Sequence, residues 1–304
     1  VFFQWEKGLN AANGALVWIA ESDDWCDLDF LETLVPLFAN EAVQLAYCHT
    51  TFIDAATLTP QWSLWEYVHD IDPERWRNPF IETAHQLVSQ AFAYKNIVPN
   101  VSSAVFRNPK ALELLDDPDW KRMRLCGDWV FYLHVIRGGL VAYSPHTENY
   151  YRIHDRNTSV SEYFGDDYYS EHEKVASVVQ HYYKVSPEVF ENQRNNLIAH
   201  WRQGPRKWSE EVFNRCYSLA RIEAQARHRK PNLLMVSYGF CTGGGETFPV
   251  ELANLMKGTG YGVTFLDCAQ TLRNEGLRRR LRPDIPVISD LADLCRIIAE
   301  FGID

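Results

Sequence analysis

The chain has 304 residues, of which 46% are hydrophobic and 23% are charged, and its formal net charge is −10. This composition excludes a collagen, a coiled coil and a chain without a folded core, and the length suits about two domains of roughly 150 residues each. The acidic excess disfavours nucleic acid as a partner, because a nucleic-acid-binding surface is basic. No apolar run approaches the roughly 18 residues of a membrane span, so we expect no transmembrane segment.

The seven cysteines are scattered along the chain, at positions 26, 48, 126, 216, 241, 268 and 295. An odd number without close spacing fits neither a disulfide framework nor a zinc knuckle, so we expect a reducing cytoplasm. The first six residues, Val-Phe-Phe-Gln-Trp-Glu, contain no basic stretch. We therefore expect no signal peptide at this end of the sequence.

The first 160 residues alternate between helical and extended patterns. Apolar residues at helical spacing predict a first helix that stops at Gly14, and the apolar run 15–20 predicts a buried strand. Asp27 is placed to cap the next helix. The remaining expected elements are strands at 43–48, 101–106, 140–144 and 148–153, helices at 80–95 and 127–137, a short helix after residue 108, and a long loop over 54–79.

The rest of the chain divides into two stretches of different character. Residues 161–231 show helix starts at Ser186 and Ser209 and few strand signals, which indicates a helical connector or bundle. From residue 232, predicted strands at 233–238, 262–266 and 285–288 alternate with predicted helices, which favours a parallel sheet. We therefore expect an α/β protein: a mixed sheet flanked by helices in 1–160, the connector in 161–231, and a partial Rossmann-like βαβ unit in 232–304.

Three acidic residues, Glu21, Asp23 and Asp24, directly follow the apolar run 15–20. Carboxylates at the carboxyl end of a strand face the crevice where open α/β sheets bind ligands. Clustered carboxylates repel one another unless a cation or hydrogen-bond donors lie between them. A hard divalent ion suits such ligands, and Mg²⁺ commonly uses one or two carboxylates together with substrate phosphates. The alternative is an acidic surface turn that caps the next helix.

The segment 7–25, KGLNAANGALVWIAESDDW, resembles the family 2 glycosyltransferases of the GT-A fold. In that family a helix ending in A-x-G leads into a strand and then into an acidic D-x-D-D motif, which stands here as Glu-Ser-Asp-Asp. The resemblance implies that Asp23 is a ligand of Mg²⁺ or Mn²⁺. It also implies that Glu21 and Asp24 support the donor nucleotide sugar or the metal, although Glu departs from the family's first residue.

A further acid, Asp128, begins a predicted apolar helix about a hundred residues later, within the sequence Cys-Gly-Asp-Trp. An inverting glycosyl transfer needs one base that takes the proton from the acceptor hydroxyl. A carboxylate at a helix N-terminus is expected to stay ionised. By the residues alone, a helix-capping role for Asp128 is favoured. The family carries its catalytic base in an acidic pair or a G-D-W at this distance, so the resemblance implies that Asp128 is the base.

The sequence Tyr-Arg-Ile-His at 151–154 stands where the family often has R-x-H. The resemblance implies that His154 binds the metal and that Arg152 contacts the diphosphate of the donor. Imidazole can bind a borderline metal, and a guanidinium can hold a phosphate through two hydrogen bonds. The alternative is a solvated polar loop, since the residues that follow are also polar.

The segment 100–107, NVSSAVFR, resembles the acceptor-side strand of the same family. The resemblance implies that Ser102 and Ser103 line the acceptor site, together with Trp129 at the start of the following helix. The alternatives are ordinary strand-edge hydroxyls for the two serines and core packing for the tryptophan.

Residues 237–247, SYGFCTGGGET, join a predicted strand to a predicted helix. The segment is neither a Walker loop nor a dinucleotide fingerprint, because the glycines are spaced differently and no Gly-Lys-Ser/Thr follows. It resembles the start of the family 4 glycosyltransferases, which have the two-domain GT-B fold. The resemblance implies ligand contacts at Gly243, Gly244, Gly245 and Glu246, and the alternative is a tight turn without a ligand.

Together the two resemblances imply a metal-assisted, inverting glycosyltransferase of surface polysaccharide synthesis. It would carry a GT-A domain at 1–160, whose opening base-binding strands we expect to be missing, and the start of a GT-B domain at 232–304. The implied partners are a nucleotide-diphosphate sugar donor and a glycan or lipid-linked acceptor. The implied location is the cytoplasm, with peripheral attachment to the inner membrane face as an option. Two alternatives stay open: a nucleotidyltransferase, and a non-catalytic carbohydrate-binding or scaffold fragment of a larger glycosyltransferase.

Overall fold

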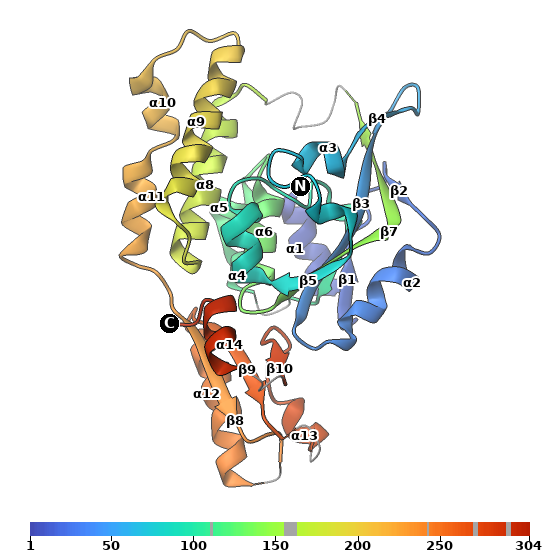
Figure 1. Cartoon of the computed structure of the whole chain (residues 1–304), viewed down its shortest axis with the longest axis vertical. Coiled ribbons are helices and arrows are strands. Elements are labelled where there is room, and N and C mark those ends of the chain that lie inside the picture. The colour runs from blue at the N-terminus through green and yellow to red at the C-terminus, as the bar shows by residue number, and fades with distance from the viewer. Residues whose placement is uncertain (110–111, 155–162, 242, 270–272, 290–292) are drawn as a thin grey trace.

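The computed structural model describes residues 1–109, 112–154, 163–241, 243–269, 273–289 and 293–304. Figure 1 shows a sheet wrapped by helices, a group of helices beside it, and a smaller unit of strands and helices below. We call these the sheet unit (1–154), the helical region (163–230) and the C-terminal unit (231–304). The chain is an α/β protein with a central mixed sheet flanked by helices, as the sequence predicts. That the three parts are separate domains stays a prediction.

The sheet unit is built on a seven-stranded sheet in the order β1-β6-β3-β7-β2, with β4 beside β3 and β5 beside β7. The two long central strands, β3 and β7, run parallel, and the other pairs are antiparallel. The sheet is therefore mixed. The strands are β1 (Leu16–Trp18), β2 (Trp25–Cys26), β3 (Val43–Asp54), β4 (Pro60–Ser63), β5 (Phe80–Thr83), β6 (Ala104–Arg107) and β7 (Leu140–Ile153).

Helices cover both faces of this sheet. Successive side chains of β3 point to opposite sides, so β3 contributes side chains to the packing on each face. On one face, α2 buries Phe30 and Leu34 against Ala46 and Cys48. On the other face, the largest core of the chain encloses α6, whose side chains are almost all buried. The helices of this unit are α1 (Phe2–Ala11), α2 (Phe30–Leu34), α3 (Leu64–Val68), α4 (Ala84–Leu87), α5 (Pro118–Lys121) and α6 (Gly127–Val135).

The helical region packs against the sheet unit through α8, which lies against α6 (Figure 1). Its helices are α8 (Asp166–Tyr182), α9 (Pro187–Gln203), α10 (Glu210–Cys216) and α11 (Leu219–Ala226). The predicted helix starts are confirmed, because Ser186 and Ser209 are the N-caps of α9 and α10. The described residues of this region contain helices and no strand, as the sequence predicts.

The C-terminal unit is a parallel three-stranded sheet in the order β10-β9-β8 with its own apolar core. The predicted alternation of strands and helices is therefore present. Its elements are β8 (Asn232–Ser237), α12 (Gly244–Gly258), β9 (Gly262–Asp267), α13 (Glu275–Arg278), β10 (Val287–Ile288) and α14 (Leu294–Glu300).

Arg137, just beyond α6, joins the sheet unit to the C-terminal unit and is buried at their junction. Its guanidinium donates to the carbonyl oxygens of Lys230, at 2.7 Å, and Gly260, at 2.8 Å, and to Oδ1 of Asn232 at 3.2 Å. A buried guanidinium needs such partners, because an unpaired charge in the interior is very unfavourable. The start of β8 is thus fixed to the end of α6.

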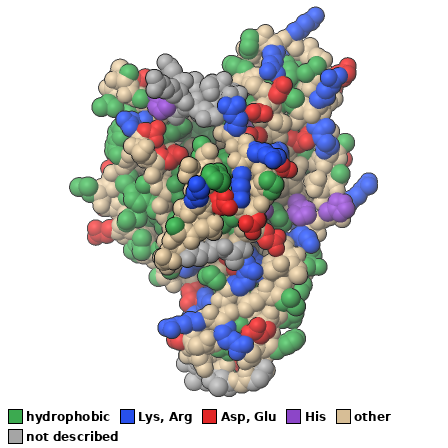
Figure 2. Space-filling model, turned by 180° about the vertical axis from the view of Figure 1, so that it is seen from behind, with side chains coloured by type: hydrophobic (Ala, Val, Ile, Leu, Met, Phe, Trp, Pro, Cys, Tyr) green, Lys and Arg blue, Asp and Glu red, His purple; other side chains and the backbone are tan. Residues whose placement is uncertain are grey.

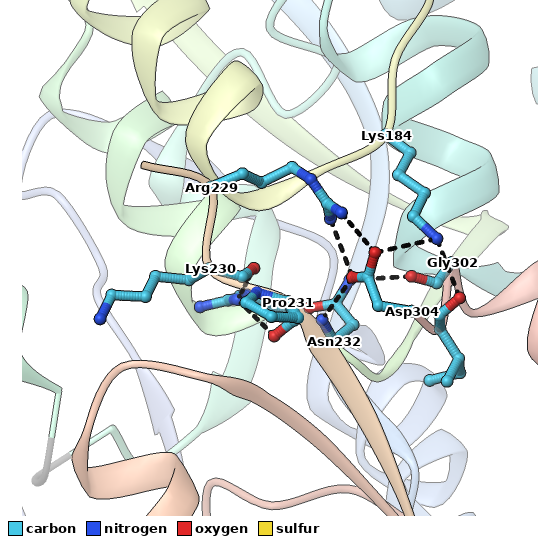
Figure 3. Close-up of polar contacts among 9 residues, drawn as sticks. Lys184, Arg229, Lys230, Pro231, Asn232, Gly302 and Asp304 are labelled. Carbon is cyan, nitrogen blue, oxygen red and sulfur yellow. Dashed lines mark hydrogen bonds and ion pairs between the residues drawn. The ribbon is translucent and has the colours of Figure 1, made fainter. Parts of the chain in front are cut away.

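A second set of contacts at the same junction centres on Asp304 (Figure 3). Its carboxylate accepts hydrogen bonds from Nη1 of Arg229 and from the backbone N–H of Asn232, at 2.8 Å and 2.9 Å, and pairs with Nζ of Lys184 at 3.1 Å. These partners hold the pKa of Asp304 far below its usual range despite the opposing effect of burial. The helical region is therefore attached to the same point of the C-terminal unit.

Several predicted elements are corrected by pairing that the sequence does not display. The run 15–20 is no buried strand: β1 has three half-buried residues and lies at the sheet edge. Asp27 does not cap α2, whose N-cap is Asp29, and instead accepts the N–H of Glu148. The expected loop 54–79 contains β4 and α3, and the expected helix 80–95 begins with β5. The strands expected at 140–144 and 148–153 form the single strand β7.

The surface seen from behind carries acidic and basic side chains interspersed over all three parts (Figure 2). Among the described residues, no helix is both long enough and apolar enough to cross a membrane.

Candidate active site

Asn100 lies beneath the acidic turn 21–24 and contacts two of its carboxylates. Its Nδ2 donates to Oε2 of Glu21 at 3.2 Å and to Oδ2 of Asp24 at 2.9 Å. Its Oδ1 accepts from Nδ2 of Asn149 on β7 and from the backbone N–H of Ser102. Asn100 is 3% exposed, so these bonds form away from water. A single buried amide therefore fixes the spacing of two acids that would otherwise repel each other.

Asp24 is held by three donors and supports the turn from within. Besides Asn100, the hydroxyl of Ser102 donates to its Oδ2 at 2.9 Å and the backbone N–H of Arg152 donates to its Oδ1 at 3.1 Å. Burial raises the pKa of Asp24, and these hydrogen bonds act in the opposite direction. Both oxygens of Asp24 thus accept hydrogen bonds from the protein.

Asp23 and His154 lie side by side at the exposed rim of the turn. Oδ2 of Asp23 is 3.3 Å from Nε2 of His154, and the two side chains are 42% and 36% exposed. Nε of Arg152 donates to the backbone oxygen of Asp23, and its guanidinium lies 5.9 Å from the centre of the Trp25 ring. The structure therefore brings the predicted metal and diphosphate residues together, although they come from opposite ends of the sheet unit.

The donor set at this rim suits a divalent cation only in part. Within the described ranges, no group of three or more His, Cys, Asp and Glu residues is placed to hold a metal. Asp23 and His154 offer one oxygen and one nitrogen. Mg²⁺ typically binds to one or two carboxylates and takes further ligands from substrate phosphates. The pair therefore fits a metal that arrives with, or is completed by, a phosphorylated substrate.

Asp128 lies at the start of α6, on a backbone segment that α8 holds in place. Glu171 on α8 is buried, and its carboxylate accepts three consecutive N–H groups, from Arg124, Leu125 and Cys126, at 2.7 Å to 2.8 Å. Asp128 itself accepts from Nδ2 of Asn96 at 3.1 Å and from the N–H of Trp129 at 2.7 Å. The helical region thus fixes the backbone that leads into Asp128.

Burial changes the protonation of Asp128 from what the sequence predicts. The helix N-terminus was expected to keep the carboxylate ionised, but its pKa is raised from 3.8 to about 7. Burial is the largest cause, the charge of Glu21 adds to it, and the bonds from Trp129 and Asn96 act in the opposite direction. Burial also raises the pKa of Glu21, from 4.5 to about 7, with Asp24 and Asp23 adding to the effect. The expectation of a permanently ionised Asp128 is therefore wrong, and an acid with a pKa near neutrality is suited to accept and release a proton.

The predicted acceptor residues Ser102, Ser103 and Trp129 are all buried. Ser102 holds the acidic turn, and the hydroxyl of Ser103 donates to the backbone oxygen of Asn100 at 2.6 Å. Trp129 donates from Nε1 to the backbone oxygen of Phe92 at 2.8 Å and stacks on its ring. Their burial does not support direct contact with an acceptor, because the core and the acidic turn already occupy these groups.

The glycine-rich segment of the C-terminal unit also differs from its predicted form. Gly244, Gly245 and Glu246 form the first turn of α12 rather than a loop, and Gly243 is its N-cap. A Cβ at Gly243 would lie 2.4 Å from Oε2 of Glu246. The Glu246 carboxylate therefore lies close to Gly243 near the helix N-terminus, where negative charge is favoured. Residue 242 lies outside the described residues.

Sequence reasoning missed the amides Asn100 and Asn96, and also Glu171. Asn100 stands in the segment that resembles the family's acceptor-side strand, but its role depends on contacts with residues about 80 positions away. Glu171 sits in the predicted connector, where an acidic residue on a helix has no distinguishing pattern. Only the fold brings these side chains to the site.

No family model matches the chain, and no curated protein matches it. Among solved structures, the chain is similar to a crystal structure of S. aureus TarS 1–349, with 12% sequence identity and a TM-score of 0.43. The match covers 73% of this chain and 66% of that one, so the chain spans slightly less than two thirds of that structure.

Proposed function

We propose that this chain is a metal-assisted, inverting glycosyltransferase that moves a sugar from a nucleotide-diphosphate donor to a glycan or lipid-linked acceptor. The observation that carries the proposal is the meeting of Asp23, Arg152 and His154 at the acidic turn, in the same unit as an Asp128 carboxylate that Asn96 holds at 3.1 Å. A base poised near neutrality beside a turn that can hold a diphosphate is what such a transfer requires. The sequence resemblance to family 2 and its GT-A fold agrees with this arrangement.

In the proposed reaction the acceptor oxygen forms a bond to the anomeric carbon of the donor while the bond from that carbon to the diphosphate oxygen breaks. The electron pair of the broken bond leaves with the diphosphate. The proton of the acceptor hydroxyl passes to the carboxylate of Asp128, which Asn96 holds in position. Attack from the side opposite to the leaving group inverts the anomeric centre.

Arg152 and the Asp23–His154 pair would bind the diphosphate side of the donor. The Arg152 guanidinium is oriented toward the turn by its bond to the Asp23 carbonyl and can donate to phosphate oxygens. Asp23 and His154 would hold Mg²⁺ or Mn²⁺, which when bound offsets the charge of the departing diphosphate. Glu21 and Asp24 keep this rim in place through Asn100.

The wider assignments rest on the sequence. We place the reaction in surface polysaccharide synthesis and in the cytoplasm, with peripheral contact to the inner membrane face. None of the seven cysteines forms a disulfide, which is compatible with a reducing compartment. We assign the C-terminal unit as the start of a GT-B domain on its parallel strands and its resemblance to family 4.

The proposal is tested by product analysis with UDP-, GDP- and dTDP-sugars in the presence of Mg²⁺ or Mn²⁺. We expect release of the nucleoside diphosphate from one donor, faster with a saccharide acceptor than without one, and absent in the Asp128→Asn variant. Release of pyrophosphate from a nucleoside triphosphate and a sugar phosphate would instead identify a nucleotidyltransferase. Saturable glycan binding without turnover of any donor would identify a binding or scaffold protein.

A further inference from the structure

Two arginines of the C-terminal unit bind a carboxylate of the sheet unit. Nη2 of Arg273 donates to both carboxylate oxygens of Glu41, at 2.5 Å and 2.8 Å, and Nε of Arg278 donates to Oε2 at 3.1 Å. Burial raises the pKa of Glu41, but the bonds and charges of the two arginines outweigh it, and the pKa lies below its usual value. Arg273 and Arg278, which we call the arginine pair, therefore hold an anionic group that has two oxygens.

The arginine pair is also supported by a contact that does not involve Glu41. The two guanidiniums lie 5.4 Å and 5.5 Å from the centre of the Phe240 ring, which is buried. Phe240 follows β8, and both arginines follow β9. In open α/β sheets, ligands bind outside the carboxyl ends of the strands. The pair therefore lies on the segments where such a sheet is expected to meet a ligand.

The arginine pair has donors that Glu41 does not use. Nε of Arg273 is buried and makes no hydrogen bond within the described residues, although a carboxylate oxygen of Glu275, which is 65% exposed, lies 3.5 Å from it. The guanidinium of Arg278 contacts Glu41 through Nε alone among the described residues. A phosphate offers at least three acceptor oxygens where a carboxylate offers two, so it can bind donors that Glu41 leaves unpaired.

A third guanidinium, that of Arg107, adds positive charge beside Glu41. It donates to the backbone oxygens of Asn40, at 3.2 Å, and Val43, at 2.8 Å, on either side of Glu41. Burial and the charge of Arg278 lower the pKa of Arg107, and the charge of Glu41 acts in the opposite direction. Arg107 has no carboxylate partner in the described part of the chain. Three guanidiniums therefore gather around one half-buried carboxylate, which favours a ligand of higher negative charge.

A cavity of about 660 Å³ lies beside the arginine pair, at the junction of the two units. Glu41 and Arg273 belong to its lining, and its walls come from β5 of the sheet unit and from β10 and α14 of the C-terminal unit (Figure 1). Small-molecule sites commonly have volumes of roughly 300–1,000 Å³. The apolar part of the lining includes Ile81, Ile297 and Phe301, so the cavity has room for an apolar group next to the anion.

The other charges of the lining largely offset one another. Glu82 is paired with Arg75, and Arg296 precedes Glu300 by one helical turn of α14. Side chains at this spacing are neighbours on a helix, and opposite charges there attract. The excess positive charge that an anionic ligand needs is therefore supplied by the arginine pair and Arg107.

We propose that this junction cavity binds a small phosphate monoester with an apolar body, whose phosphate replaces the Glu41 carboxylate on Arg273 and Arg278. Binding would release the segment 40–43 from the C-terminal unit, so the ligand and the contact between the two units compete for the same donors. The inference goes beyond the proposed transfer reaction and uses none of the residues assigned to it.

Calorimetric titration of the full chain in a metal-free buffer tests the site, with inorganic phosphate and phenyl phosphate as the probes. We expect saturable binding that is about tenfold tighter in Glu41→Gln, because that variant removes the competing charge. Phenyl phosphate should bind about tenfold tighter than inorganic phosphate, because its ring leaves water for the cavity. Arg273→Gln in the Glu41→Gln background should abolish the binding. Glu251→Gln, which removes a carboxylate from the exposed pair with Arg280, is the matched control and should bind as the wild type does.

Other outcomes would overturn the inference. Binding that Arg152→Gln abolishes and Arg273→Gln leaves intact would assign the phosphate to the acidic rim, in agreement with the proposed function. Absence of binding in every variant would leave the ion pairs of Glu41 as a structural link alone. Equal affinity for the two probes would refute a ligand with an apolar body. Cosedimentation with phosphatidic acid vesicles, without binding of phenyl phosphate, would replace the small ligand by a lipid surface.

Hydrogen exchange gives a second readout that needs no turnover. Saturation with phenyl phosphate should speed exchange of the N–H groups of Ala42 and Val43, which are bonded to Asn40 in the segment that Glu41 anchors. The N–H of Asn232, at the separate junction with Asp304, should keep its protection. Unchanged exchange at 42 and 43 in the saturated protein would show that the phosphate does not replace Glu41.

Discussion

The substitution Asp128→Asn separates the chemistry of this acid from its effect on stability. Asparagine has the same shape and can still accept the N–H of Trp129, but it cannot take a proton from an acceptor. Removal of a general base commonly lowers turnover by about 10² to 10⁴. We therefore expect kcat for transfer to fall by at least about a hundredfold, with the affinity for the donor nucleotide unchanged.

The same variant should be more stable than the wild type at high pH. The folded-state pKa of Asp128 is raised from 3.8 to about 7, so the folded protein holds this proton across that interval and the unfolded chain does not. Below about pH 4 both states hold the proton, so the ionisation of Asp128 does not change the stability. The free energy of unfolding then falls as the pH rises from about 4, and the loss is complete once the pH has passed through about 7. Three pKa units correspond to at most about 4 kcal/mol.

The measured gain should be smaller than this ceiling, because the Asn variant must re-form the bond from Asn96 with a weaker acceptor. A net gain of about 1–2 kcal/mol would raise the melting temperature of a chain of this size by a few degrees. Thermal unfolding of both proteins at pH 4 and pH 8 measures it. Equal turnover of the two proteins, or equal melting temperatures at both pH values, would refute the reasoning about this acid.

Three further predictions concern the rest of the site. Asp23→Ala and His154→Ala should each weaken metal-dependent binding of a nucleoside diphosphate about tenfold, because each removes one of two donors, as calorimetric titration would show. The kcat/KM of transfer should rise with pH toward a plateau, with an apparent pKa near 7, because Asp128 must be ionised to act. The titratable groups that interact electrostatically with Asp128 are Glu21, Tyr67, Tyr132 and Cys126. Asn100→Leu should lower the free energy of unfolding by about 2–4 kcal/mol in denaturant titrations, because two half-buried carboxylates lose a buried donor.

Each of these predictions has an outcome that contradicts it. Unchanged titration curves for both rim variants would show that the metal binds elsewhere or does not bind. A rate that falls as the pH rises through 7 would assign the titrating group to an acid that must stay protonated. Asn100→Leu with wild-type stability would show that the acidic turn does not depend on the buried amide.

The sequence predicts the fold where one element carries its own signal. The helix at 127–137, the helix starts at Ser186 and Ser209 and the strands of the C-terminal unit follow from periodicity and capping, and the structure has them. The predictions fail where the pairing of strands determines the secondary structure. β4 and β5 are short strands that exist because β3 and β7 offer them an edge. The signals of such strands depend on their neighbours more than on their own residues.

The candidate site, too, could be predicted from the sequence only in part. The acids and the R-x-H were predicted to meet, and the structure places Asp23, Arg152 and His154 together. The protonation of Asp128 could not be predicted, because burial by other elements outweighs the local effect of the helix end. Asn100 could not be recognised either, since an amide acquires its role only from the side chains that the fold brings to it.

The central claim is that the acidic rim binds the diphosphate of a nucleotide donor together with a metal. Calorimetric titration of the chain with UDP, GDP and dTDP, each with and without Mn²⁺, tests it most directly, with Asp23→Ala as the paired variant. We predict that one of the three nucleotides binds in the presence of Mn²⁺ and that the affinity falls in the variant. Binding of none of them, or binding that neither Mn²⁺ nor Asp23→Ala alters, would contradict the claim.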